Sequence, residues 1–228
     1  MSGVAQAKAF GEGPLSRAAA LVYHLLVIEL LFLATSVPGL VLLVLLERDP
    51  SNLPLVAACV LPLGPALSAA LYALHHRHAD LTDLRPVATF WRGYRLNLLA
   101  ALRIWIPWLV WLTIVAVNLT NFAAAAVPRW WAVLLVLVAA AVSLWGANAM
   151  VIVSLFTFRA RDVARLAAYF LVRTPGVAFA NACLLIVAAG VVVFSSEAVL
   201  ALLGSVLTLA LLANSRPMVA RIREEFTA

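Results

Sequence analysis

The chain alternates between long apolar runs and short polar segments. A helix needs roughly 20 mainly apolar residues to cross a membrane, and six runs reach or approach that length. They cover residues 18–46, 53–74, 96–117, 130–158, 176–194 and 198–213. The sixth run is short and follows a turn of three residues, 195–197, so it should form a tight hairpin with the fifth. The pattern predicts an all-α protein, a single domain over residues 1–228 built as a bundle of six transmembrane helices.

The basic residues are distributed unevenly between the two sides of these six spans. Thirteen of the sixteen fall in segments on one side, against Arg48 and Arg129 on the other, and Arg103 lies inside the third run. Cytoplasmic loops of membrane proteins carry an excess of Lys and Arg. We therefore expect both termini to lie in the cytoplasm.

Composition supports a membrane protein and argues against a soluble one. Hydrophobic residues make up 65% of the chain and charged residues 11%, whereas a soluble domain carries about 25% charge. The net charge of +6 does not indicate nucleic-acid binding, because the basic residues are separated by apolar runs. Fifteen arginines against one lysine are typical of a GC-rich bacterial genome. We expect a multi-pass protein of the bacterial cytoplasmic membrane, with the lipid bilayer as its main partner.

Two linkers on the basic side resemble each other. The first reads DLRPVATFWRGYRLN from Asp83, and the second reads DVARLAAYFLVRTPG from Asp162. Each can lie flat at the membrane surface, with its rings in the acyl boundary and its arginines at the headgroups. We predict that both are interfacial elbow helices, short helices along the membrane surface, and plain loops remain the alternative. The residues concerned are Phe90, Trp91, Tyr94, Arg95, Tyr169, Phe170 and Arg173.

Ionisable residues inside a span are costly, so they are usually paired or functional. Glu29 lies roughly 18 Å along the first helix from Arg17, and Arg103 roughly 12 Å along the third from Arg95, by the helical rise. His24 lies at a similar depth. We predict a buried Glu29–Arg103 pair that clamps the two helices, and a substrate or proton site is the alternative.

The second span contains a predicted break at Pro62, Gly64 and Pro65. Neither proline has an amide hydrogen to donate within the helix, so the helix should kink or break there. A break of this kind exposes backbone groups to substrate in some transporters, although kinked structural helices are commoner. Trp105, Trp108 and Trp111 follow each other at every third position and could stack on a sugar, but packing is the favoured reading.

The stretch HHRHADLTD places His76, Asp80 and Asp83 at i, i+4 and i+7, on one face of a continued helix. An imidazole and two carboxylates can bind a divalent metal. The stretch also lies where a span ends, and polar residues are ordinary there. We favour a solvated helix end and expect no metal. Because no nucleophile–base pair, phosphate-binding loop or metal motif occurs, we also expect no cofactor and no enzymatic activity.

Three motifs stand out along the chain: a first span that ends in the small/Pro turn Ser36-Val37-Pro38, the sequence Gly64-Pro65-Ala66 in the second, and the series Phe90, Tyr94, Arg95 and Asn97 at the start of the third. Together they resemble the YesL-like family of bacterial integral membrane proteins, whose function is unknown. The resemblance covers essentially the whole chain, although hydropathy alone carries it in the second half.

Members of that family often lie beside genes for carbohydrate ABC importers and polysaccharide-degrading enzymes. The resemblance therefore implies a non-catalytic accessory protein that works with ABC permease subunits. The alternative is a small-solute carrier that uses the broken second helix together with Glu29 and Arg103.

The predicted orientation can be tested by cysteine labelling. In a chain with Cys59 and Cys183 replaced by alanine, Asp49→Cys and Pro128→Cys should react with a membrane-impermeant maleimide added from outside. Asp83→Cys and Asp162→Cys should react only after the membrane is permeabilised, because the basic side faces the cytoplasm. Labelling of the Asp83→Cys protein in intact cells would contradict this topology.

Overall fold

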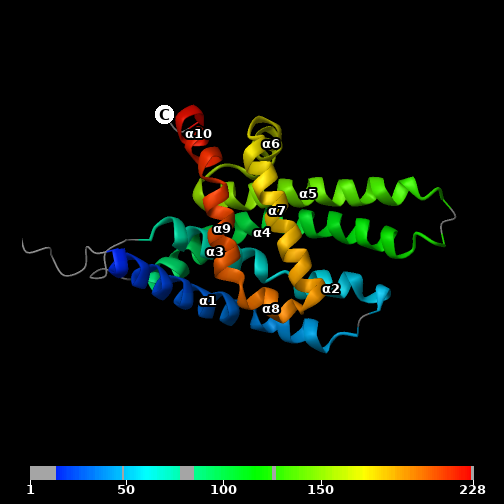
Figure 1. The fold of residues 1–228 in the computed structure, drawn as a ribbon, viewed down its shortest axis with the longest axis horizontal. Helices are drawn as coiled ribbons and strands as arrows, with labels where there is room; N and C mark the ends of the chain where they lie inside the picture. Colours follow the sequence, from blue (N-terminus) through cyan, green and yellow to red (C-terminus); the bar gives the residue numbers. More distant parts are fainter. Residues whose placement is uncertain (1–13, 48, 78–84, 125–126, 227–228) are drawn as a thin grey trace, which may run out of the picture.

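A computed structural model describes residues 14–47, 49–77, 85–124 and 127–226. These residues form helices and connecting turns, with no strand among them (Figure 1). The elements are α1 (Pro14–Leu45), the 3-10 helix η1 (Pro50–Asn52), α2 (Leu53–Cys59), α3 (Leu63–His75), α4 (Pro86–Thr120), α5 (Trp130–Leu155), α6 (Ala160–Arg173), α7 (Pro175–Phe194), α8 (Glu197–Leu202), α9 (Gly204–Asn214) and α10 (Arg216–Phe226).

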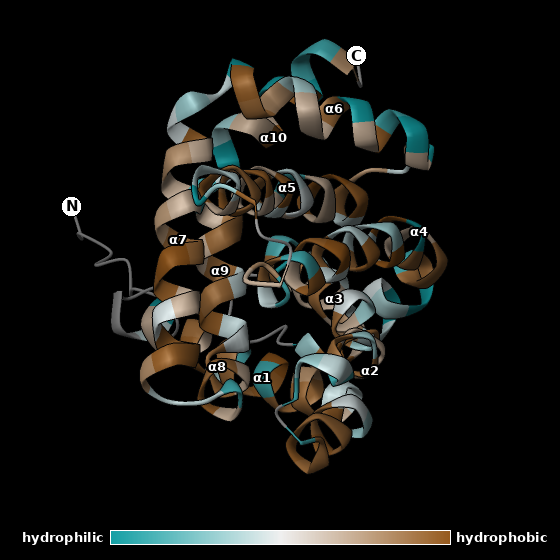
Figure 2. Cartoon of the chain, turned by 90° about the vertical axis from the view of Figure 1, so that its right-hand side faces the viewer, coloured by the Kyte–Doolittle hydropathy of each residue, from teal (hydrophilic) through white to brown (hydrophobic). Residues whose placement is uncertain are grey.

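The helices form two groups that cross each other. In Figure 1, α1, the α2–α3 pair, α4 and α5 run along the long axis of the molecule, and α7 and α9 run across them. Helix α3 lies centrally, in contact with α1, α4, α5 and α9. Figure 2 shows that α7 is hydrophobic along much of its length, whereas α6 and α10 carry hydrophilic residues at one end of the molecule.

Four helices are long and apolar enough to cross a membrane, namely α1, α4, α5 and α7, and the bent α2–α3 pair is a fifth candidate. The sixth apolar run is divided into α8 and α9, and α9 has only 11 residues, about 16 Å of helix. The architecture is therefore that of an all-helical membrane protein with four or five candidate spans. The predicted count of six is not confirmed.

Two local predictions concern where helices end. The tight turn between α7 and α8 is confirmed, and the Ser196 hydroxyl caps α8 by accepting a hydrogen bond from the Val199 amide at 3.3 Å. Helix α1 ends at Leu45, close to the predicted end of the first apolar run at residue 46. It passes through Pro38, so the small/Pro motif of the family resemblance does not mark its end.

Glycines allow close approach of aromatic rings at four helix crossings. A Cβ atom added to any of these glycines would overlap the ring that it faces. The pairs are Gly64 with Trp105, Gly93 with Tyr72, Gly146 with Trp108, and Gly204 with Phe32. Apolar side chains gain little by leaving lipid for another helix. Helices in membranes therefore associate through small residues that allow close packing.

Polar side chains join the helices at a few buried points. The hydroxyls of Ser154 of α5 and Ser68 of α3 share a hydrogen bond at 2.9 Å, and Asn97 of α4 donates to the Ser154 carbonyl at 3.1 Å. Asn181 of α7 donates to the side-chain oxygen of Asn148 of α5 at 3.4 Å. Such interhelical hydrogen bonds contribute about 1 kcal/mol each.

The glycine contacts predict opposite effects for two matched substitutions. Gly146→Ala should lower the thermal stability in detergent, at a cost of about 1–3 kcal/mol, because the new methyl overlaps the Trp108 ring. Gly190→Ala in α7 meets open space and should be neutral or stabilise by up to about 1 kcal/mol through helix propensity. Equal changes in melting temperature for the two variants would contradict this packing.

Candidate functional site

The predicted break in the second span is confirmed. Helices α2 and α3 meet at an angle of 43°. Pro62 and Pro65 cannot supply the amide hydrogens that the carbonyls of Ala58 and Leu61 would accept in a continuous α-helix. Those carbonyls instead accept hydrogen bonds from the amides of Leu61 at 3.2 Å and Gly64 at 3.4 Å, each one residue earlier. The bend is therefore a short stretch of 3-10 geometry imposed by the two prolines.

Trp105 of α4 closes one side of this break. Its indole nitrogen donates a hydrogen bond to the Val60 carbonyl at 3.2 Å, and its ring lies on Gly64. Trp105 is only 7% exposed. On the other side, α1 approaches so closely that a Cβ at Gly39 would overlap the Cys59 carbonyl. The backbone at the break thus contacts both α1 and α4, and Val60 and Leu63 also line a cavity.

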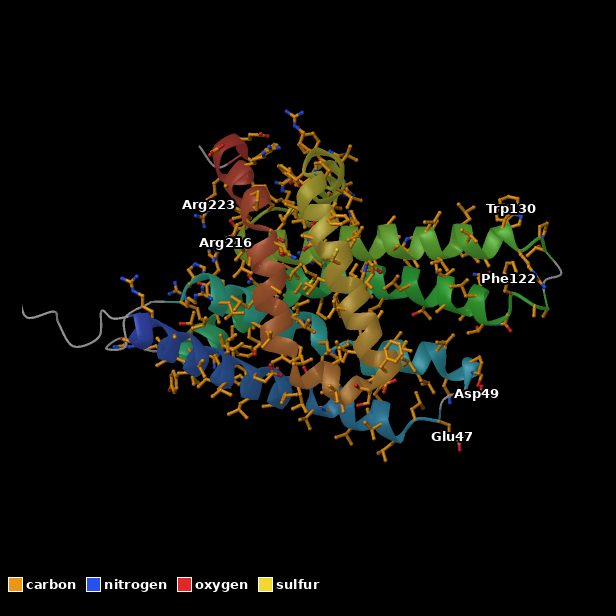
Figure 3. All side chains as sticks on the ribbon, in the orientation of Figure 1. Glu47, Asp49, Phe122, Trp130, Arg216 and Arg223 are labelled. Carbon is orange, nitrogen blue, oxygen red and sulfur yellow. The ribbon has the colours of Figure 1, made fainter. Side chains whose placement is uncertain are left out.

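A large cavity lies beside the break, between α1, the α2–α3 pair and the α7–α9 segment. Its volume is about 920 Å³, and leucine, valine and alanine side chains provide most of its lining. Glu47, Asp49 and Glu197 also line it. Figure 3 places Glu47 and Asp49 at the end of the molecule opposite Arg216 and Arg223. The cavity is therefore apolar, with acidic groups toward the less basic end.

Asp49 keeps its negative charge at this end. Hydrogen bonds from Ser51, including one from its amide at 2.8 Å, hold the pKa of the Asp49 carboxyl below its ordinary value. The same contact caps η1.

Glu29 binds the start of α9. One carboxylate oxygen, Oε2, accepts a hydrogen bond from the Ser205 amide at 2.6 Å. A carboxylate at a helix N-terminus is stabilised by the free amide groups and the helix dipole. The other oxygen, Oε1, is buried, has no hydrogen-bond partner in the described part of the chain, and lies close to Gly204, which lines the large cavity.

Arg103 does not pair with Glu29, and the predicted clamp between α1 and α4 is wrong in this respect. The Arg103 side chain is exposed on the outside of α4. It lies in a row of exposed residues spaced alternately by three and four, on one face of the helix. The row consists of Leu96, Leu99, Arg103, Ile106 and Val110. The rise per residue, counted along the sequence, gives how far along its helix each side chain lies. It does not give the direction in which the side chain points around the helix axis.

The sequence predicted that His24 is a buried polar residue, and the residue is only 4% exposed. Its Nδ1 lies 2.9 Å from the Ala20 carbonyl of its own helix. The ring therefore binds α1 itself, and no hydrogen bond joins it to Glu29 or Arg103 in the described residues.

The first predicted elbow does not form a separate helix. Helix α4 begins at Pro86 and continues to Thr120, so Phe90, Trp91, Tyr94 and Arg95 belong to its first turns. Proline favours the first turn of a helix, and nothing between it and the apolar run stops the helix. Phe90 is fully buried, whereas Trp91 is 41% exposed, so the two rings face opposite environments.

The second predicted elbow is a distinct helix, α6. Its buried residues Val163, Ala167 and Phe170 share one face, and Tyr169 is exposed. Arg173 lies in the last turn, where a cation is stabilised by the helix dipole, and its carbonyl accepts a hydrogen bond from Arg221 of α10 at 3.3 Å. Its amphipathic pattern suits a surface helix, although its position at a membrane surface remains a prediction.

The histidine stretch shows no metal site in its described part. The Nδ1 atom of His76 lies 2.9 Å from the Tyr72 carbonyl of its own helix, and His76 is exposed. His78, Asp80 and Asp83 lie outside the described residues. Within the ranges that are described, no three His, Cys, Asp or Glu side chains lie close enough together to bind a metal ion.

The tryptophans of α4 divide into two kinds. Trp108, like Trp105, is a packing residue, and its indole nitrogen donates to the Val142 carbonyl of α5 at 3.0 Å. Trp111 is 56% exposed. Stacking of all three rings on one sugar is excluded, because two of them are engaged inside the bundle.

The contact between Glu29 and α9 was not predicted from the sequence. Its donor is a backbone amide, which carries no residue signature, and Ser205 lies far from Glu29 in the chain. The available signal was the pair Gly204-Ser205 inside an apolar run, since small residues often mark a close helix crossing.

Comparison with known families gives one match. Residues 25–119, which extend from within α1 to near the end of α4, match a family model described as "Protein of unknown function, DUF624". The resemblance to YesL-like proteins is consistent with this family. No curated protein matches the chain, and no solved structure does.

The environment of Glu29 predicts a graded series of effects. Glu29→Ala should cost about 1–3 kcal/mol of stability, because it leaves the Ser205 amide without its acceptor. Glu29→Gln should cost less, about 0.3–1 kcal/mol, because the amide oxygen still accepts the bond and only the charge is lost. Thermal unfolding in detergent measures both.

The same measurement separates this arrangement from the predicted ion pair. Arg103→Met combined with Glu29→Ala should give additive losses, within about 0.5 kcal/mol, because the residues share no contact. Recovery of stability in the double variant would show that the two side chains do meet.

Proposed function

We propose that the protein is a non-catalytic accessory protein of the membrane, and that it binds another membrane protein through the outer face of α4. The observation that carries this proposal is the exposed Arg103 at the centre of an otherwise apolar row. That row is formed by Leu96, Leu99, Ile106 and Val110.

An arginine in this position is costly in lipid. Insertion scales give about 2.5–3.5 kcal/mol for Arg at the centre of a membrane helix. Arg103 stands near the middle of α4, a helix of 35 residues that is long and apolar enough to span. A carboxylate or carbonyl group on a partner helix would remove this cost through a charge-assisted hydrogen bond.

Contact between Arg103 and the lipid headgroups is another way to lower the cost of this arginine in the membrane, and the distances support it less well. Side chains on a helix point toward its N-terminus, which for α4 is the basic end, and arginine can extend to the interface in this way. The last basic residue before Arg103 is Arg95, roughly 12 Å away along the helix by the helical rise. That distance exceeds the length of the side chain, so a partner group nearby supports the proposal better.

The resemblance to YesL-like proteins directs the proposal to one partner. Members of that family often lie beside genes for carbohydrate ABC importers, so we propose permease subunits of such an importer in the bacterial cytoplasmic membrane. The basic ends of the helices then face the cytoplasm. The sequence supports a non-catalytic role through the lack of a nucleophile–base pair or a phosphate-binding loop.

A small-solute carrier is the second candidate, and the cavity of about 920 Å³ beside the broken α2–α3 span favours it. In some transporters, broken helices bind substrate through freed backbone groups. Here the Val60 carbonyl is already engaged by Trp105. The accessory role therefore ranks first.

Affinity purification tests the proposed partner. The tagged protein, solubilised in a mild detergent, should co-purify with the ABC permease subunits of the same membrane. Arg103→Leu should reduce the recovered permease by about tenfold or more, because the partner's polar group then lacks its charged donor. Quantitative mass spectrometry of the eluate measures this ratio.

Arg165→Leu is the matched control, because Arg165 is an exposed arginine on a different helix, α6, outside the row on α4. It should leave the recovery unchanged. Equal loss in both variants, or none in either, would contradict the role of Arg103. Transport of a solute by the purified protein alone in liposomes would favour the carrier instead.

A further inference from the structure

A second, smaller pocket lies at the basic end of the molecule. It has a volume of about 350 Å³ and is formed by the end of α3 together with α9 and α10. Its apolar part includes Leu74, Leu212 and Val219. This pocket is separate from the large cavity beside the break and from the outer face of α4.

Three arginines and a histidine supply its polar lining, namely Arg77, Arg216, Arg223 and His75. None of the residues that line this pocket in the described ranges is acidic. Figure 3 shows Arg216 and Arg223 on the same side of the molecule, along α10. The pocket therefore gathers positive charge from segments that lie far apart in the sequence.

Arg77 lies partly buried at this site, and its Nη1 atom is buried without a hydrogen-bond partner among the residues that the structure describes. Burial, and then the positive charge of Arg216, lower the pKa of the Arg77 guanidinium. A guanidinium nevertheless stays protonated in proteins. A buried cationic donor without an acceptor, next to a second cation, is destabilising unless an anion compensates it.

His75 orients a further donor. The Nη2 atom of Arg223 lies 2.7 Å from Nε2 of His75. Because arginine has no acceptor, Nε2 must accept this bond, and His75 is neutral in this arrangement. The histidine thus binds Arg223, which also lines the pocket, without adding charge.

We propose that this pocket binds a phosphate group, carried by an anionic phospholipid or by a free phosphate compound. The planar fork of arginine matches the oxygens of a phosphate, and several donors converge here on one small volume. Binding satisfies the Nη1 donor of Arg77 and neutralises the repulsion between Arg77 and Arg216. The adjacent apolar lining suits the organic part of such a ligand.

Thermal unfolding of the purified full-length protein provides the first test. Sodium phosphate should raise the melting temperature of the wild type more than sodium chloride does at equal ionic strength. Arg77→Gln should weaken the apparent affinity for phosphate by about tenfold or more. Without phosphate, Arg77→Gln should melt at the same temperature as the wild type or higher, because an uncompensated charge has been removed.

Native mass spectrometry distinguishes the two sources of phosphate. Protein taken from nanodiscs of phosphatidylglycerol and phosphatidylcholine should retain phosphatidylglycerol if the source is a lipid, and added phosphate should displace it. If phosphate stabilises the protein but no lipid is retained, the ligand of the pocket is a free phosphate compound. Both results support the site.

Arg161→Gln is the control. Arg161 is an exposed residue of α6 that does not line the pocket, so the substitution removes one positive charge elsewhere on the molecule. Arg216→Gln serves as a second site variant if Arg77→Gln does not fold. The proposal is overturned if the wild type binds neither probe, or if Arg161→Gln loses binding as fully as the site variants do.

Discussion

The hydrogen bond from the Trp105 indole to the Val60 carbonyl fixes how the central helices fit together. The Val60 carbonyl already accepts a hydrogen bond from the Leu63 amide inside the bend, at 3.1 Å, and its second lone pair accepts one from Trp105 of α4. Gly64 gives the Trp105 ring the space to make this contact. The bend in one helix and the Trp105 ring of its neighbour therefore fit each other through a hydrogen bond and a close ring contact.

That requirement also determines the orientation of α4. Successive residues of an α-helix are separated by about 100°, so residues two apart point in nearly opposite directions. With Trp105 inside, Arg103 must face outward. The engaged break and the outward direction of Arg103 thus follow from the same contact, and the proposed partner surface lies opposite it.

A comparable contact joins α1 to the start of α9, where the Glu29 carboxylate accepts a hydrogen bond from a backbone amide. Gly204 lets Phe32 approach, and Glu29 then reaches the Ser205 amide. This contact brings a short apolar helix to the centre of the molecule, although α9 is too short to cross a membrane alone. Its position depends on α1 and α3 rather than on its own length.

The sequence predicted what depends on local chemistry. Apolar runs gave the long helices, prolines gave the break, and Ser195-Ser196 gave the turn before α8. Contacts between segments that are distant along the chain could not be predicted from the sequence. Glu29 and Arg103 have the right depth for a pair, but depth along an axis says nothing about rotation around it. The cluster of Arg77, Arg216 and Arg223 was likewise hidden, because each reads alone as an ordinary basic residue at a helix end.

The unbroken course of α4 has a mechanical consequence. Its 35 residues extend about 52 Å, whereas the hydrocarbon core of a bilayer is about 30 Å thick. If it stands upright in a bilayer, roughly 20 Å of helix extends beyond the hydrocarbon core, into the headgroup regions and the water on either side. Its first turns stay packed, because Phe90 is buried and Gly93 lies against Tyr72 of α3. The helix is continuous from these turns to Trp105, so a displacement of one end of α4 also moves the residue that binds the bend between α2 and α3.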